Sequence, residues 1–87
     1  MSVTLSVADM ARVKTYEITA EMVANVIEIP VASGDPVAVG DTVVLLESMK
    51  MEIPVLAEQA GEVGEIRAEP GDVVQEGDVL LTLAVTV

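Results

Sequence analysis

The residues best suited to chemistry lie in one short run, "LLESMKMEIP", around a single lysine. Lys50 is one of two lysines in the chain, Met49 and Met51 bracket it, and Glu47 and Glu52 are the nearest acidic residues on either side. Nearby carboxylates stabilise the ammonium form of a lysine, whereas lysines that act as nucleophiles unaided are desolvated or lie beside another cation. We therefore interpret Lys50 as a lysine that is presented to a separate enzyme.

The same run predicts a tight hairpin with this lysine at its tip. If "TVVLLES" and "MEIPVLA" are antiparallel strands, Met49 and Lys50 form a two-residue turn. Such turns favour pairs like Asn-Gly because positive φ is required, so Met-Lys is a poor choice. In this register Glu47 faces Glu52, and like charges so placed are mildly destabilising. Local rules that are broken together at one exposed point indicate a functional constraint.

The rest of the composition offers little other chemistry. The chain has no cysteine and no histidine, which excludes a disulfide framework, a thiolate metal site and the usual general base. We therefore expect no catalytic residues and a protein that is not an enzyme on its own. Aspartates recur beside glycines, but they are spread over four separate turns and lack the dense alternation of oxygen ligands found in calcium loops, so we assign no metal site.

The charge balance restricts the partners. Four basic against fifteen acidic residues give a formal net charge of -11, which repels nucleic acid and anionic membrane surfaces. We expect partners that present basic surface or are indifferent to charge. No basic residue precedes the apolar stretch near the start, and Asp9 and Arg12 interrupt it, which argues against a signal peptide. No run approaches membrane-spanning length, so the expected location is the cytoplasm.

The elements that must position the lysine come from a repeated half-unit. The 87 residues suffice for one small domain, and a core of Val, Ile, Leu, Ala and Met without Phe or Trp favours an all-β fold. "VIEIPVASGDPVAVGDTVVLLE", from Val26, matches "VGEIRAEPGDVVQEGDVLLTLA", from Val63, at a constant offset of 37 residues without a gap. Each half predicts a strand, a "GDxVxxGD" turn segment and a strand that is apolar on both faces. Two such halves should close about an approximate twofold axis.

Particular residues are expected to build the turn segments. Glycine supplies positive φ, short acidic side chains bond nearby backbone amides, and one valine in each segment anchors it to the core. The expected turn residues are Gly34, Gly71, Asp35, Asp41, Asp72 and Asp78, and the expected anchors are Val37 and Val74.

The first residues have no partner in this repeat. We therefore divide the chain into an N-terminal arm at residues 1–20, expected to be flexible, and a domain at residues 21–87. "SVTLSVA" in the arm alternates like a strand. Docking of the arm onto a partner, or an extension that arises from the translation start, are alternative interpretations.

The central run resembles the attachment motif of a known family. "ESMKMEIPV" is similar to the motif of biotin carboxyl carrier domains, whose core is Met-Lys-Met, and the "GDxVxxGD" segments look like those of biotinyl and lipoyl domains. The resemblance covers roughly residues 22–86. It implies a flattened barrel or sandwich of two four-stranded antiparallel sheets, with an internal pseudo-twofold repeat and the modified lysine on an exposed hairpin.

The resemblance also implies roles for individual residues. By position, Lys50 is joined through its amine to the carboxyl group of biotin by a separate biotin protein ligase. Met49 and Met51 match the flanking methionines and Glu47 matches an acidic position upstream, which implies recognition by the ligase or by partners. Ser48 replaces the more usual alanine, a small-for-small change that should be tolerated. The gapless repeat leaves no room for the inserted "thumb" of some bacterial carriers.

The implied function is that of a biotin carboxyl carrier protein of an acyl-CoA carboxylase, of the acetyl- or propionyl-CoA type, in fatty acid metabolism. A biotin carboxylase subunit would use ATP and bicarbonate to carboxylate the tethered biotin, and a carboxyltransferase subunit would pass the carboxyl group of carboxybiotin to the acceptor. The carrier would contribute effective concentration and catalyse neither step. The short arm and the chain end directly after the last strand favour a free-standing carrier over a fragment.

Two other functions remain open. The first is a lipoyl-type acyl carrier of a 2-oxoacid dehydrogenase complex, which is disfavoured because lipoyl domains usually have Asp-Lys-Ala at the hairpin. The second is an unmodified β-domain that serves as an interaction module. The identity of the acyl acceptor does not follow from these residues, since that specificity belongs to the carboxyltransferase.

Overall fold

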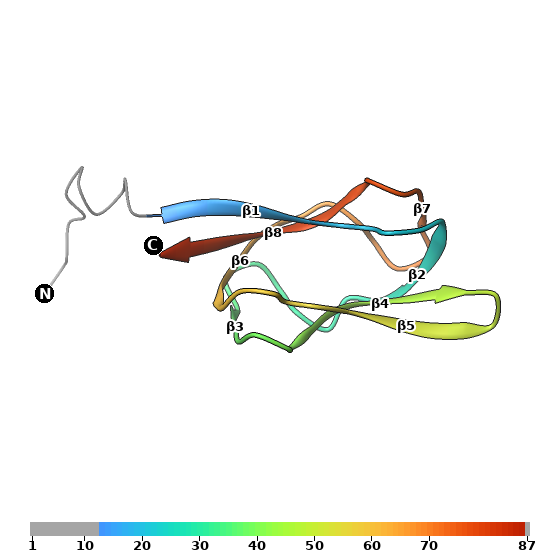
Figure 1. Cartoon of the computed structure of the whole chain (residues 1–87), viewed down its shortest axis with the longest axis horizontal. Coiled ribbons are helices and arrows are strands. Elements are labelled where there is room, and N and C mark those ends of the chain that lie inside the picture. The colour runs from blue at the N-terminus through green and yellow to red at the C-terminus, as the bar shows by residue number, and fades with distance from the viewer. Residues whose placement is uncertain (1–12, 87) are drawn as a thin grey trace, which may run out of the picture.

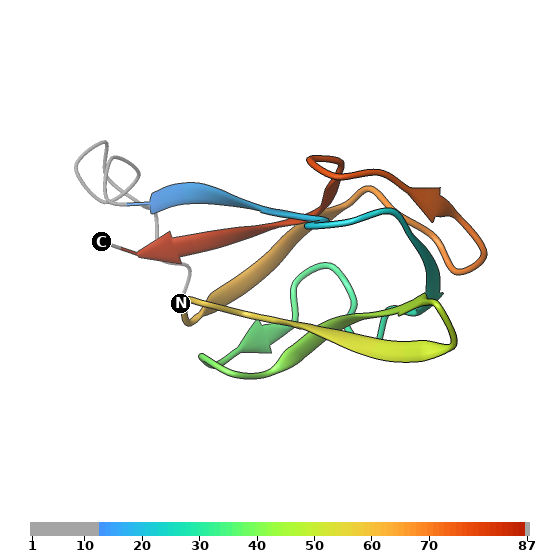
Figure 2. The ribbon, with the colours of Figure 1, turned by 45° about the vertical axis from the view of Figure 1, so that its right-hand side comes forward.

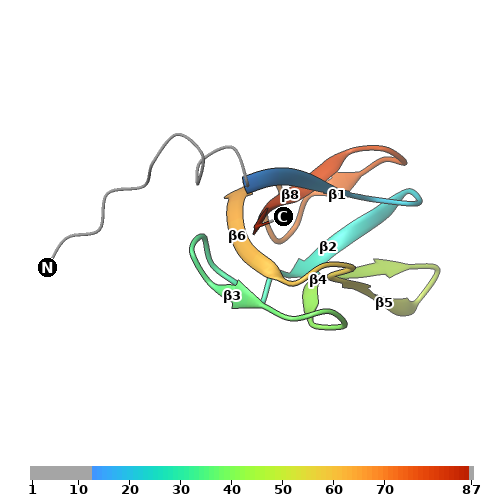
Figure 3. The same cartoon turned by 60° about the vertical axis from the view of Figure 1, so that its left-hand side comes forward.

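The computed structural model describes residues 13–86, which form an all-β fold of two four-stranded antiparallel sheets. One sheet has the strand order β1-β8-β6-β3 and the other β5-β4-β2-β7 (Figure 1). In Figure 3, β1 and β8 lie above β4 and β5, which belong to the second layer. The predicted fold class is confirmed. The strands are β1 (Val13–Thr19), β2 (Ala24–Glu28), β3 (Pro36–Val37), β4 (Thr42–Ser48), β5 (Met51–Leu56), β6 (Gly61–Ile66), β7 (Val73–Val74) and β8 (Val79–Thr86).

The core lies between the sheets and is built around β4 and β8. These strands are the two runs predicted to be apolar on both faces, and each occupies an inner position of its sheet. The predicted anchors Val37 and Val74 are also buried, at 7% and 5% exposure. The fully buried large side chains are Leu46, Leu80, Leu81, Leu83, Val43, Val44 and Val63.

Each sheet is a copy of the other. The 37-residue offset relates β1–β4 to β5–β8, and the strand registers agree: Leu46 pairs with Ile53 as Leu83 pairs with Tyr16. The connection from β2 to β3 matches that from β6 to β7 without an insertion, so neither contains a thumb. The predicted closure of two similar halves is confirmed.

The repeat begins earlier than the sequence analysis predicts. The predicted arm at residues 1–20 includes β1, yet β1 pairs with β8 along its whole length, so residues 13–19 belong to the sheet. The start of the repeat is hard to see in the sequence because equivalent residues are not identical there. Ile18 and its counterpart Val55 share only apolar character and partial burial. Residues 1–12 lie outside the described residues, and their expected flexibility stays a prediction.

The Gly-Asp turns join the two halves, and their predicted chemistry is confirmed. Gly34 and Gly71 have φ values of 92° and 97°. The Gly34 N–H donates to the Val63 carbonyl at 2.7 Å, and the related Gly71 N–H donates to the Val26 carbonyl at 2.8 Å. Each turn thus bonds the opposite half. Each aspartate carboxylate also accepts a backbone N–H three residues upstream: Asp35 from Ala32, Asp41 from Ala38, Asp72 from Glu69 and Asp78 from Gln75.

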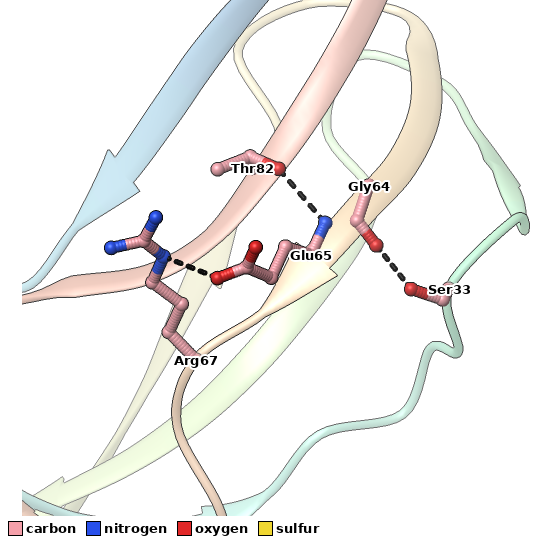
Figure 4. Close-up of polar contacts among 5 residues, drawn as sticks. All are labelled: Ser33, Gly64, Glu65, Arg67 and Thr82. Atoms are coloured by element: carbon pink, nitrogen blue, oxygen red, sulfur yellow. Dashed lines mark hydrogen bonds and ion pairs between the residues drawn. The ribbon is translucent and has the colours of Figure 1, made fainter.

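One polar cluster distinguishes the second half from the first (Figure 4). Within the irregular part of β6, the Glu65 N–H donates to Thr82 Oγ1 at 2.9 Å, and Ser33 Oγ donates to the Gly64 carbonyl. A Cβ on Gly64 would lie 2.6 Å from Thr82 Oγ1, so the hydroxyl requires glycine there. Arg67 and Glu65 form an ion pair of 2.8 Å on the surface, where such pairs contribute little stability.

Candidate functional site

Met49 and Lys50 form the predicted two-residue turn between β4 and β5. Their φ values are 52° and 65°, so both central residues occupy the left-handed region that a type I′ turn requires. Within residues 13–86 they are the only non-glycine residues at positive φ. Because a Cβ disfavours this conformation by about 1–2 kcal/mol per residue, the turn retains two side chains at a cost in stability.

The hairpin pairs like charges directly behind the turn. Ser48 faces Met51, and Glu47 faces Glu52, as the sequence predicts for the two glutamates. On the other side of β4, Asn25 of β2 lies in register with Glu47. Both glutamate side chains are exposed, so solvent screens their repulsion.

Within residues 13–86, neither of these carboxylates forms an ion pair. Among the residues that the structure describes, the one ion pair joins Arg67 to Glu65, away from the hairpin. Neither Glu47 nor Glu52 therefore forms an ion pair with the Lys50 ammonium.

The tip is the part of the hairpin most open to solvent. Met49 is 92% exposed and Met51 66% exposed, and Lys50 between them is also exposed. At the foot of the hairpin, Leu46 is only 2% exposed and pairs with the half-buried Ile53. A buried base therefore holds an exposed tip, and the packing of the base offsets the cost of the turn.

One groove of the surface lies away from the tip. A groove of about 630 Å³ runs between the edge strands β1 and β5, and its walls include Tyr16 and Ile53. None of the three residues at the tip lines this groove. The tip therefore presents an exposed primary amine outside this groove, which suits covalent attachment by a separate enzyme.

The tip lies at one end of the sandwich. The β4–β5 hairpin is at one end of the molecule, whereas β1 begins and β8 ends at the other (Figures 1 and 2). An enzyme that encloses the hairpin therefore approaches the end of the sandwich opposite to the start of β1 and the end of β8.

Neither a metal site nor a membrane span accompanies this hairpin. Residues 13–86 contain no group of three or more metal-ligating side chains placed to hold an ion. Over the same range, the chain forms no helix of the length and apolarity needed to cross a membrane.

All the predicted site residues gather at this hairpin. Met49, Lys50 and Met51 form its tip. Glu47 belongs to the second residue pair from the turn. Their functional roles stay predictions. Asn25 was not among the predicted residues, because no motif marks it and its position beside Glu47 depends on the register of β2 with β4.

Comparison with known proteins places this hairpin in a family. The family model described as "Biotin-requiring enzyme" matches residues 12–83. The "Biotinylated protein TB7.3 homolog" of Mycobacterium leprae is 50% identical over 68 residues, 78% of this chain and 96% of that protein. The "Biotin/lipoyl attachment protein" of Bacillus subtilis is 45% identical over 67 residues, 77% of this chain and 92% of that protein.

A solved structure agrees with these matches. A single-chain, multi-domain long-chain acyl-CoA carboxylase aligns with a TM-score of 0.78 and 28% identity, covering 99% of this chain and 8% of that one. Sequence and fold thus point the same way, and the chain belongs to the biotinyl/lipoyl domain family.

Proposed function

We propose that this chain is a biotin carboxyl carrier protein and that Lys50 is its attachment residue. The observation that carries the proposal is the Met49–Lys50 turn, which holds two non-glycine residues at positive φ at the most exposed point of the hairpin. A turn selected for stability alone would use residues such as Asn-Gly. Membership of the biotinyl/lipoyl family supplies the chemical reason for keeping a lysine there.

The attachment is an amide bond between Lys50 Nζ and the carboxyl carbon of biotin. An ammonium and a carboxylate do not condense in water, so a biotin protein ligase must activate the carboxyl group with ATP as an acyl adenylate, with release of pyrophosphate. The deprotonated amine then forms the C–N bond as the bond to AMP breaks, and the ligase accepts the protons that the amine loses. The exposed turn lets such an enzyme surround the lysine. Biotin, once attached, supplies a ureido nitrogen that accepts a carboxyl group.

The neighbouring residues serve recognition in this proposal. Met49 and Met51 offer exposed, adaptable apolar contacts on either side of the amine. Glu47 and Glu52 form an exposed acidic pair that complements basic residues of a partner. None of these side chains performs chemistry on the lysine.

The proposed partners are a biotin carboxylase subunit and a carboxyltransferase subunit of an acyl-CoA carboxylase, of the acetyl- or propionyl-CoA type. The structural match to a multi-domain long-chain acyl-CoA carboxylase supports partners of the acyl-CoA carboxylase class, because the chain corresponds to only 8% of that protein and its other domains make up the rest. The carrier catalyses neither half-reaction. It holds a flexible arm on a rigid tip, so the carried group meets both sites at high effective concentration.

Intact-mass measurement after co-expression with a biotin protein ligase tests the attachment site. We expect a single biotinyl increment on the wild-type chain, its loss in Lys50→Arg, and its retention in Lys14→Arg. Lys14 is a matched control because it is the other lysine and is also exposed. An unmodified wild-type chain, or a biotinyl group that persists in Lys50→Arg, would contradict the proposal.

A lipoyl carrier is the second candidate, and the name of the B. subtilis relative, "Biotin/lipoyl attachment protein", favours retaining it. Co-expression with a lipoate ligase and lipoic acid separates the two. We expect no lipoyl increment, because the methionines around Lys50 differ from the lipoyl pattern. A lipoyl increment without a biotinyl one would reverse the assignment.

A transfer assay tests the proposed partners and acceptor. The loaded chain is mixed with a biotin carboxylase, a carboxyltransferase, ATP and labelled bicarbonate, and a panel of acyl-CoA substrates is compared. We expect label in acetyl- or propionyl-CoA products and none with the Lys50→Arg chain. Transfer only to an acceptor that is not an acyl-CoA would contradict this part of the proposal.

A further inference from the structure

The methionines are the most oxidisable side chains of this protein. The chain has five methionines but no cysteine, tryptophan or histidine, and a single tyrosine. Thioether sulfur is therefore the softest nucleophile present, and its reaction with peroxide gives a sulfoxide that reductases can reverse. An oxidant that reaches the folded chain is expected to act on methionine.

The methionines in the described part of the chain differ in their exposure to solvent. Within residues 13–86, Met49 is 92% exposed, Met51 66% and Met22 37%. The two most accessible of the three bracket Lys50, while Met22 lies at the wall of the groove between β1 and β5. Because peroxide must touch the sulfur, the tip should react before the groove.

Oxidation at the tip leaves the core untouched. Neither Met49 nor Met51 belongs to the buried core or packs against it. Conversion of a core methionine to its polar sulfoxide would disrupt packing, but here the polar oxygen enters solvent. The change is confined to the surface that presents the lysine.

We infer that the tip is an oxidation-sensitive site, in which sulfoxide formation at Met49 and Met51 slows the loading of Lys50. In the reaction, a thioether lone pair attacks one peroxide oxygen, the O–O bond breaks, and a sulfoxide and water form. Sulfur is oxidised by two electrons and hydrogen peroxide is reduced. The modification site stands on exposure alone, whereas its effect on loading rests on the proposed function.

The effect follows from the contacts that the ligase must make. An enzyme that acts on Lys50 Nζ must enclose a tip whose flanking side chains are both methionines. The sulfoxide replaces an apolar, polarizable surface with a strong hydrogen-bond acceptor that must be desolvated. If the lost apolar contact weakens the affinity of the ligase for the tip about tenfold, loading at low chain concentration becomes about tenfold slower.

The experiment treats the unmodified full chain with hydrogen peroxide, maps sulfoxides by peptide mass spectrometry, and then measures the rate of biotin loading. We expect oxidation of Met49 first, then Met51, then Met22, an unchanged thermal midpoint, and loading about tenfold slower. Methionine sulfoxide reductase should restore the rate. The ratio of treated to untreated rates should be near one in a Met49→Leu/Met51→Leu chain, whatever its basal rate, and should stay low in Met22→Leu.

Each outcome decides a separate point. Oxidation of Met22 before the tip methionines would overturn the assigned site. Full oxidation of Met49 and Met51 with an unchanged loading rate would overturn the effect on loading. A chain that the ligase does not load even before treatment would overturn the proposed function, and the order of oxidation would still test the site.

Discussion

The β4–β5 and β8–β1 strand pairs, at opposite ends of the molecule, have the same register but differ in their residues. In the first, Glu47 faces Glu52, and the equivalent pair at the other end is Ala84 and Thr15. The registers of the two strand pairs match position by position, including the shift near the far end of each pair. The pairing therefore forms without acidic residues, so the fold does not require the two glutamates.

The turns show the same contrast. The fold places glycine wherever its own turns need positive φ, at Gly34, Gly40, Gly71 and Gly77. The hairpin tip reaches the same region of φ with Met49 and Lys50. Stability explains the first set of residues, and the proposed attachment function accounts for the second.

The largest expected effects test whether the two halves are equivalent in energy. Leu46→Ala and Leu83→Ala remove related side chains that are 2% and 1% exposed. We expect each to lower the free energy of unfolding by about 2–5 kcal/mol, through lost burial and a residual cavity. Urea denaturation of both variants checks this. A large loss for one and almost none for the other would break the equivalence.

Substitutions at the two kinds of positive-φ turn should change the stability of the fold in opposite directions. Gly77→Ala forces a Cβ to φ 90° in open space, so we expect a purely conformational loss of about 1–2 kcal/mol. Met49→Asn places a residue that tolerates positive φ in the hairpin and should gain roughly 0.5–1 kcal/mol. Thermal denaturation measures both. A destabilised Met49→Asn chain would show that the tip methionine supports the fold.

Removing the like-charge pair should stabilise the chain slightly. Glu52→Thr installs the residue type of the equivalent position Thr15, and we expect a gain of about 0.2–1 kcal/mol at low salt. The gain should shrink as ionic strength rises, because salt screens exposed charges. Thr15→Glu is the matched control, since it faces Ala84 and creates no glutamate pair with β8. A loss of stability in Glu52→Thr would mean that the pair has a structural role.

The smallest effect on stability is expected for the tip methionines. Because both are exposed, Met49→Leu/Met51→Leu should leave the free energy of unfolding within about 0.5 kcal/mol of wild type. The rates of loading and of carboxyl transfer should change, since these side chains flank the amine. Denaturation curves and transfer rates give the two readouts. Failure of this variant to fold would show that the methionines serve the core.

The sequence predicts the turns and the hairpin well because both depend on local chemistry. Gly34 and Asp35 stand at the fixed offset from Gly71 and Asp72, and each aspartate bonds a nearby backbone amide as expected. At the tip, the choice of a two-residue loop sets the register, so the pairing of Glu47 with Glu52 follows directly.

The features that depend on contacts between distant segments are harder to predict. β1 matches β5 only in its pattern of half-buried apolar residues, such as Tyr16 and Ile53, so its place in the sheet is not evident from identities. The bond from Glu65 to the Thr82 hydroxyl depends on an irregular pairing of β6 with β8. No local pattern encodes either feature.

Tandem mass spectrometry of the two peptides that contain Lys50 and Lys14, after co-expression of the full chain with biotin and lipoate ligases together, tests the central claim most directly. The account predicts biotin on Lys50 and an unmodified Lys14. Biotin on Lys14, a lipoyl group on Lys50, or an unmodified tip would contradict it.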